Sequence, residues 1–194
     1  HVIYHSFEGN QFNLYHAYRK ADGSFSASSR MTSLGAEFRG AFFPSVEVSG
    51  ERIDMVWQGK SLRGGTLADD LYVISSTNNG SSWSSFTRIT GMTGKGSSAR
   101  PALKNVSGRL YLAYQNNDSG NWKIMLTDSV DGRNFSAPRA VFETNTNSFA
   151  PSLAWDGTDL VIFFYDNREG AYAVNAVEFS LATGTFGPPR RISD

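Results

Sequence analysis

The chain of 194 residues is built from a unit that recurs about every fifty residues. Three of the units open with a proline that leads into an extended stretch, at 44–48, 101–106 and 151–155. After a turn with glycine, an apolar run follows that ends in an aromatic residue and an amide or acid. We align the aromatic residues of four such runs as Phe7, Trp57, Tyr114 and Tyr165. A repeat of this length is one supersecondary unit that must stack on its neighbours to bury a core.

Two further strands complete each unit. A third strand is expected at 12–18, 71–75, 122–127 and 171–179, and each leads into a glycine turn closed by an aromatic residue. A short fourth strand then returns, as at 86–90 and 139–142, and no helical periodicity interrupts the pattern. The sequence therefore predicts an all-β fold, a single β-propeller domain of four-stranded antiparallel blades. The approximate blades are 1–36, 37–92, 93–143 and 144–194.

The first unit begins at its second strand, so four units supply 15 predicted strands and the first blade lacks its innermost member. An unpaired inner edge invites further pairing. We expect additional blades upstream, residues beyond Asp194 or a second chain in a homo-oligomer to pair it.

The balance of charges excludes some partners. Lys+Arg and Asp+Glu both number 18, and no basic stripe is present, so nucleic acid is not an expected partner. The longest apolar run, 160–165, is far below the roughly 20 residues of a membrane-spanning helix. Without cysteine there is neither a disulfide nor a thiolate site. No cofactor or metal is expected, because His5 and His16 lack metal-ligand spacing, although the oxygens of 116–118 leave calcium open without an EF-hand pattern.

The glycine turns resemble a known repeat. The two clearest, STNNGSSW at 76–83 and SVDGRNF at 129–135, resemble the Asp-box (BNR) repeat Ser-x-Asp-x-Gly-x-Thr-Trp of sialidases and related propellers. A short polar side chain caps such a turn and glycine adopts positive φ. The first copy has asparagine in place of the acid, and the second is one residue shorter. The residues assigned this structural role are Asp22, Asn78, Gly80, Trp83, Asp131, Gly132 and Phe135.

The resemblance implies a secreted or cell-surface protein whose ligand lies on the face opposite the Asp boxes. The loops after the second strand gather polar residues there, and the expected ligand-binding residues are Glu8, Gln58, Gln115, Asn116, Asp166, Asn167 and Arg168. The crossings between units add Arg39, Phe42, Phe43, Arg100, Asn147 and Phe149. An aromatic ring beside an amide suits a sugar. Adjacent strand residues face opposite sides, however, so the aromatic residues also fit a purely structural role in the core.

Sialidases, whose repeat these turns resemble, bind the carboxylate of their substrate with three arginines. They use a tyrosine nucleophile with a glutamate partner, and an aspartic acid as the acid. Their Arg-Ile-Pro motif has no match here, since Arg100 stands one position off. If the chain is an enzyme, the catalytic candidates are Asp166, Glu169, Tyr165, Arg100 and Arg168. Arg63, Arg100 and Arg168 either converge on a ligand or are unrelated surface residues. The run 166–170 is either an acid/base set or a solvated hairpin tip.

These observations favour a lectin-like propeller that binds a glycan or small sugar on the face formed by the loops after the second strand and the crossings between units. A sialidase-like glycoside hydrolase, or a blade fragment of one, is the alternative. A structural or assembly module is the second alternative.

Overall fold

The computed structural model describes residues 1–32, 38–63, 65–91 and 96–193, which form four antiparallel sheets. The first sheet contains β1 (Val2–Glu8), β2 (Gln11–Ala17) and β3 (Ser29–Arg30). The second contains β4 (Phe38–Ser49), β5 (Arg52–Arg63), β6 (Thr66–Ser76) and β7 (Thr87–Arg88). The third contains β8 (Ser98–Val106), β9 (Arg109–Asn116), β10 (Lys123–Ser129) and β11 (Arg139–Ala140). The fourth contains β12 (Ser148–Trp155), β13 (Leu160–Glu169), β14 (Ala171–Ser180), β15 (Thr185–Phe186) and β16 (Arg190–Arg191).

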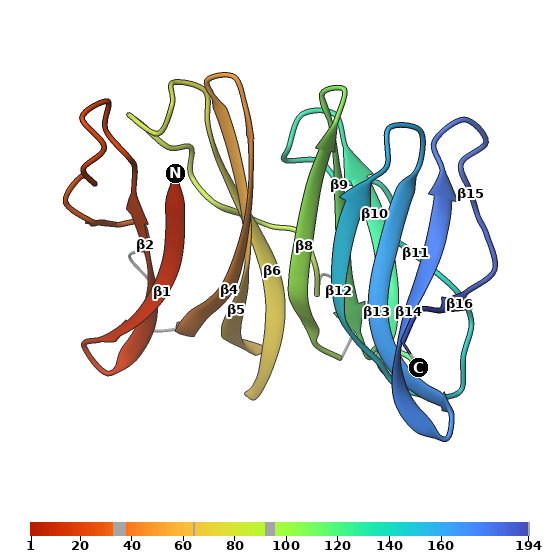
Figure 1. Ribbon diagram of the computed structural model, residues 1–194. Coiled ribbons are helices and arrows are strands. Elements are labelled where there is room, and N and C mark those ends of the chain that lie inside the picture. The colour runs from red at the N-terminus through yellow and green to blue at the C-terminus, as the bar shows by residue number, and fades with distance from the viewer. Residues whose placement is uncertain (33–37, 64, 92–95, 194) are drawn as a thin grey trace.

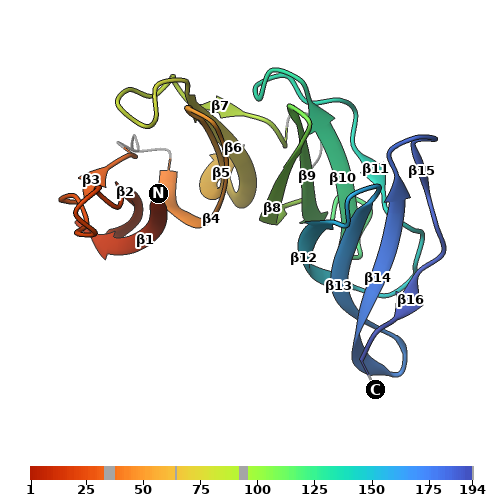
Figure 2. The same ribbon diagram turned by 45° about the horizontal axis from the view of Figure 1, so that its top comes forward.

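The sheets stand side by side as the blades of a β-propeller and follow an arc (Figures 1 and 2). Strands β4, β8 and β12 lie on the inner side of the arc and contact one another, while β7, β11 and β15 lie outside. The predicted all-β propeller fold is confirmed. Hairpins β1–β2, β5–β6 and β13–β14 lie at the lower end in Figure 1, and we call this end the loop face. The glycine turns lie at the other end.

The strand count differs by one from the expectation. Within the described residues, the first blade has three strands and β1 pairs only with β2, as the sequence predicted. The last blade has a fifth strand, because its outer segment pairs with β14 twice, through β15 and again through β16. The described chain therefore has 16 strands rather than 15. None of the described residues forms a helix that is long and apolar enough to cross a membrane.

The predicted alignment of the aromatic residues is wrong in the last blade. Gln58 lies opposite Phe42 and Gln115 opposite Ala99, but the residue at the same ladder position in β13 is Tyr165, opposite Phe149. The preceding position is occupied by Trp57 in β5 and by Tyr114 in β9. In β13 it is therefore occupied by Phe164, not by Tyr165. The error arises because β13 has three successive aromatic residues, Phe163, Phe164 and Tyr165, and the alignment took the last, which precedes the acid Asp166.

The same correction applies to the first blade. The N–H of Met31 bonds to the carbonyl of Leu14 as the N–H of Ile89 bonds to that of Leu71, so Leu14 and Leu71 are equivalent. Their partners in β1 and β5 are His5 and Gln58. Tyr4, rather than Phe7, is thus the counterpart of Trp57.

The core lies between blades, and the corrected aromatic position fills it. Trp57 is 1% exposed and packs in a cluster with Leu14 of the first blade. Tyr114 packs with Leu71 of the second blade, and Phe164 with Ile124 of the third. Each of these three rings thus points from its own sheet toward the preceding blade, which is how a stack of small sheets buries a continuous core.

Short polar side chains accept backbone N–H groups in the glycine turns. Asp131 Oδ1 accepts hydrogen bonds from the N–H groups of Arg133 and Asn134, both at 2.8 Å. These bonds hold the pKa of the Asp131 carboxyl well below its usual range. Asn78 Oδ1 accepts the N–H of Ser82 at 2.9 Å, so the amide replaces the acid in the preceding blade. Gly132 has a φ of 74°, and a side chain there would collide with Arg52.

The other residues assigned to the turns also contact their own turn or a core cluster, and their structural role stays a prediction. Asp22 accepts the N–H of Ser24 at 2.9 Å, and Gly80 has a φ of 80°. Trp83 packs against the cluster between the first two blades, and Phe135 against the cluster between the second and third.

Candidate functional site

The inner strands β4, β8 and β12 each carry a bulge at the same place, and β4 has a further register shift between Phe38 and Gly40. Phe43, Arg100 and Ala150 have φ values of 48°, 56° and 48°, in the left-handed region that non-glycine residues seldom occupy, and each directly precedes a proline. At each bulge the register with the neighbouring strand shifts. Proline fits there because a bulge needs no ladder N–H. Strained backbone of this kind concentrates at functional sites.

Side chains from the preceding blade hold two of the bulges. Gln58 Oε1 accepts the N–H of Arg100 at 3.2 Å, and Gln115 Oε1 accepts the N–H of Ala150 at 3.0 Å. Both glutamines are buried. They were expected to touch a ligand; the structure instead gives each a bond that joins two blades, and ligand binding by them stays a prediction.

Aromatic rings gather around the first bulge on the loop face. The ring centroids of Phe7 and Phe12 are 5.2 Å apart, those of Phe12 and Phe42 5.0 Å, and those of Phe42 and Phe43 6.2 Å. His5 lies 5.7 Å from Phe43 in an edge-on arrangement. We call these five rings the aromatic strip. It runs from the β1–β2 hairpin to the inner strand β4, and Phe7 at its outer end is 61% exposed.

Arg100 ends the aromatic strip on the side of the third blade. Its guanidinium carbon lies 3.7 Å from the centroid of the Phe43 ring, which is a close cation–π contact. Arg100 is exposed and forms no ion pair among the described residues. The N–H groups at the rim of the guanidinium are therefore free to donate to a ligand that lies over the rings.

The carboxylate of Glu8 points away from the aromatic strip, because Glu8 alternates with Phe7 along β1 and bonds to Tyr15 on the other face of the sheet. Glu8, at the tip of β1, accepts a hydrogen bond from the hydroxyl of Tyr15, and this bond is the largest cause of the raised pKa of Tyr15. Glu8 is exposed, so oxygen positions remain open to solvent. The predicted ligand residue Glu8 thus lies on the same hairpin as Phe7 and Phe12.

Two of the catalytic candidates, Asp166 and Arg168, are brought together, but as an ion pair. Asp166, 1% exposed, pairs with Arg168, whose Nη2 lies 2.8 Å from Asp166 Oδ2. Asn175 also donates to Asp166 at 3.1 Å, and the Arg168 guanidinium lies 4.6 Å from the centre of the Phe142 ring. This ion pair is enclosed between the third and fourth blades.

The remaining candidates point elsewhere. Tyr165 alternates with Asp166 along β13 and lies on the other face of that sheet, in ring contact with Phe149 and Tyr172 at 5.6 and 5.7 Å. Glu169 is exposed and pairs with Arg191 at 3.0 Å. The side chain of Arg63 lies outside the described residues.

The polar side chains at the β9–β10 loop bond to one another and to the segment that precedes β8. Asn116 Nδ2 donates to Asp118 Oδ2 at 3.1 Å, and Asn117 Oδ1 accepts the N–H of Ser97 at 2.6 Å. Asn167 is partly buried in the β13–β14 hairpin. Within the described ranges, no group of three or more His, Cys, Asp and Glu residues is arranged to hold a metal ion.

Sequence reasoning missed two members of the aromatic strip, His5 and Phe12. It placed Phe42, Phe43 and Arg100 on the ligand face, and singled out Arg100 as a catalytic candidate but neither phenylalanine. The available signal was the residue before each repeated proline, because proline disfavours helical backbone in its predecessor and marks a bulge in a strand.

Neither a protein-family model nor a curated protein matches this sequence. Solved structures do match. The catalytic domain of the GH62 α-L-arabinofuranosidase of Coprinopsis cinerea aligns with a TM-score of 0.55 at 19% identity, over 84% of this chain and 54% of its own. The β-1,2-mannobiose phosphorylase of Listeria innocua, in complex with β-1,2-mannobiose, aligns with a TM-score of 0.62 at 13% identity, over 94% of this chain and 54% of its own. A thermostable family-43 glycoside hydrolase aligns with a TM-score of 0.60 at 12% identity, over 99% of this chain and 76% of its own.

The chain spans about half the length of the first two of these structures. At such identities the similarity shows the fold alone. The matches include five-bladed propeller glycoside hydrolases, so they support a propeller but not the sialidase-type family that the Asp-box turns resemble.

Proposed function

We propose that this protein binds glycans, and that the aromatic strip with Arg100 is the binding surface. The observation that carries the proposal is the continuous row of rings that ends in an exposed guanidinium. A sugar has apolar C–H faces that stack on rings, and hydroxyl edges that accept hydrogen bonds from arginine. The strip offers both on one side, because Phe7 is exposed and Arg100 is not engaged in an ion pair.

Three further points support a glycan rather than another ligand. A formal net charge of zero gives the chain no general attraction for polyanions. The bulges place Phe43 and Arg100 on the inner strands, on the concave side of the arc. The solved structures with the same fold include carbohydrate-active enzymes, one of them in complex with a disaccharide.

The test is a glycan array followed by calorimetry with the best ligand. Arg100→Ala should weaken binding about tenfold, since a hydrogen bond from a charged donor contributes roughly 1.5–3 kcal/mol. Arg133→Ala is the matched control, because Arg133 is also exposed but lies on a glycine turn at the opposite end. Equal affinities of the two variants would contradict the proposal.

Glycoside hydrolysis is the second candidate, favoured by the same fold similarity. Its test is turnover of a panel of aryl glycosides, including sialosides. Activity that is lost in Asp166→Asn, while the variant melts like the wild type, would support the enzyme.

A further inference from the structure

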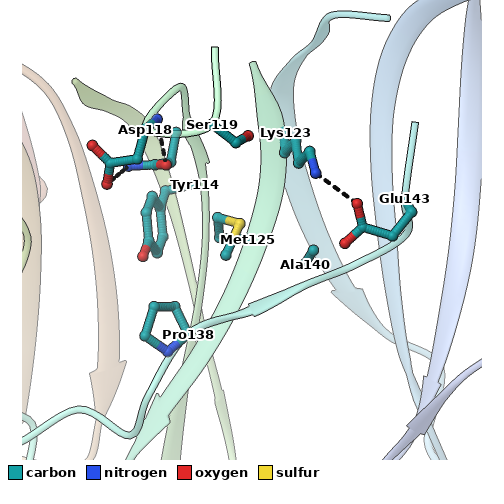
Figure 3. Close-up of a pocket in the computed structure, with 9 residues that line it drawn as sticks. Tyr114, Asp118, Ser119, Lys123, Met125, Pro138, Ala140 and Glu143 are labelled. Carbon is teal, nitrogen blue, oxygen red and sulfur yellow. Dashed lines mark hydrogen bonds and ion pairs between the residues drawn. The ribbon is translucent and has the colours of Figure 1, made fainter. Parts of the chain in front are cut away.

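A cavity lies on the third blade, away from the aromatic strip (Figure 3). Its volume is about 310 Å³, at the lower end of the range for small-molecule sites. The lining residues come from β9, β10, the β9–β10 loop and the segment around β11. Tyr114, Met125, Pro138 and Ala140 form its apolar floor. A cavity of this size fits one sugar ring rather than an extended oligomer.

Tyr114 gives the cavity an unusual polar group. The residue is 3% exposed and packs with the apolar cluster between the second and third blades. Its hydroxyl has no hydrogen-bond partner among the residues that the structure describes. The hydroxyl oxygen is not one of the fully buried side-chain atoms that lack a partner, so it is accessible from the cavity that Tyr114 lines. Burial, with a smaller contribution from Asp118, raises the pKa of Tyr114, so the hydroxyl keeps its proton at neutral pH and is able to donate it.

The rim of the cavity combines donors and acceptors. Figure 3 shows Asp118 on the side of Tyr114, and Lys123 paired with Glu143 on the other side of Met125. The Lys123 Nζ to Glu143 Oε2 distance is 2.6 Å. Asp118 accepts the N–H of Gly96 at 2.6 Å, and its oxygens retain further acceptor positions.

The charges of the rim select against anions. Asp118 and Glu143 are two carboxylates, and Lys123 is the one cation among the residues that line the cavity. Their sum is negative, so a carboxylated or sulfated ring would meet net repulsion. An uncharged ring with several hydroxyls meets acceptors at Asp118 and Glu143, and a donor at Lys123.

We propose that this cavity is a binding site for a single uncharged monosaccharide unit, whose hydroxyl completes the hydrogen bonding of Tyr114 while its C–H face rests on Met125 and Pro138. The cavity shares no residue with the aromatic strip, so the two binding sites are tested independently.

The test uses protein labelled with ¹³C at the methionine methyl groups. Met125 lines the cavity, whereas Met55 is buried between the first two blades and serves as an internal reference. The probes are methyl β-glucopyranoside, methyl β-galactopyranoside, methyl α-mannopyranoside and glucuronate, each added to roughly 100 mM because a single ring in an open site binds weakly. At least one neutral glycoside should shift the Met125 signal saturably and leave Met55 unchanged. Glucuronate should bind more weakly.

Tyr114→Phe removes only the hydroxyl and should weaken the effect on Met125 about tenfold. Because that hydroxyl bonds to no described residue, the melting temperature should not fall. Tyr111→Phe, on the same strand but in contact with Phe179 of the fourth blade, is the matched control and should bind as the wild type does. The proposal is overturned if no neutral glycoside moves Met125, if Tyr114→Phe responds equally, or if its melting temperature drops.

Discussion

At the scale of single residues, one side chain determines each glycine turn. Asp131 accepts two backbone N–H bonds and the amide of Asn134 at 2.6 Å, and Asn78 makes the corresponding backbone bond in the second blade. An amide therefore suffices for the geometry, while the carboxylate adds charge. The lowered pKa of Asp131 means that the ionised form stabilises the folded state.

This predicts a pH dependence for Asp131→Asn. The folded pKa is below the ordinary value near 4, so the contribution of the carboxylate is present above about pH 4 and is lost as the pH falls through the folded pKa. Wild type should be more stable than Asp131→Asn at pH 7, and the difference should shrink below about pH 4. Urea unfolding from pH 7 to pH 2 measures it. A difference that stays constant across this range would contradict the explanation.

At the scale of elements, the bulges and the glutamines act together. At two of the three bulges a backbone N–H turns out of its own ladder, and Gln58 or Gln115 of the preceding blade accepts it. The bond thus fixes the inner strand of one blade to the second strand of another. It also positions Arg100 for its contact with Phe43.

Gln115→Met should therefore destabilise the protein. Methionine has a similar shape but leaves the N–H of Ala150 without an acceptor, which costs about 1–3 kcal/mol. Gln58→Met should cost a similar amount at Arg100. Chemical denaturation of both variants measures the effect. A loss below about 0.5 kcal/mol in both, the size of an ordinary surface change, would show that the bonds do not hold the blades together.

At the scale of the whole molecule, the sequence was sufficient for the propeller fold and for which loops lie at the same end of the blades. Repeated prolines and glycine turns fix the strand order, and the order fixes which loops share an end. The register of the outer blades was not predictable, because an acid follows an aromatic residue at Phe7 and at Tyr165, which lie at other ladder positions than Trp57. The strip was missed for a related reason: His5 and Phe12 reach Phe42 only through packing between blades, which no local pattern encodes.

The central claim is that glycans bind on the loop face, and one pair of variants tests it most directly. Phe7 and Phe25 belong to the same blade and are 61% and 57% exposed, but Phe7 lies in the aromatic strip and Phe25 follows the glycine turn at the opposite end. Calorimetry with the best array ligand should show binding by Phe7→Ala weakened several-fold, about 1 kcal/mol for a lost ring contact, and binding by Phe25→Ala unchanged. Unchanged affinity in Phe7→Ala, or an equal loss in both variants, would contradict the account.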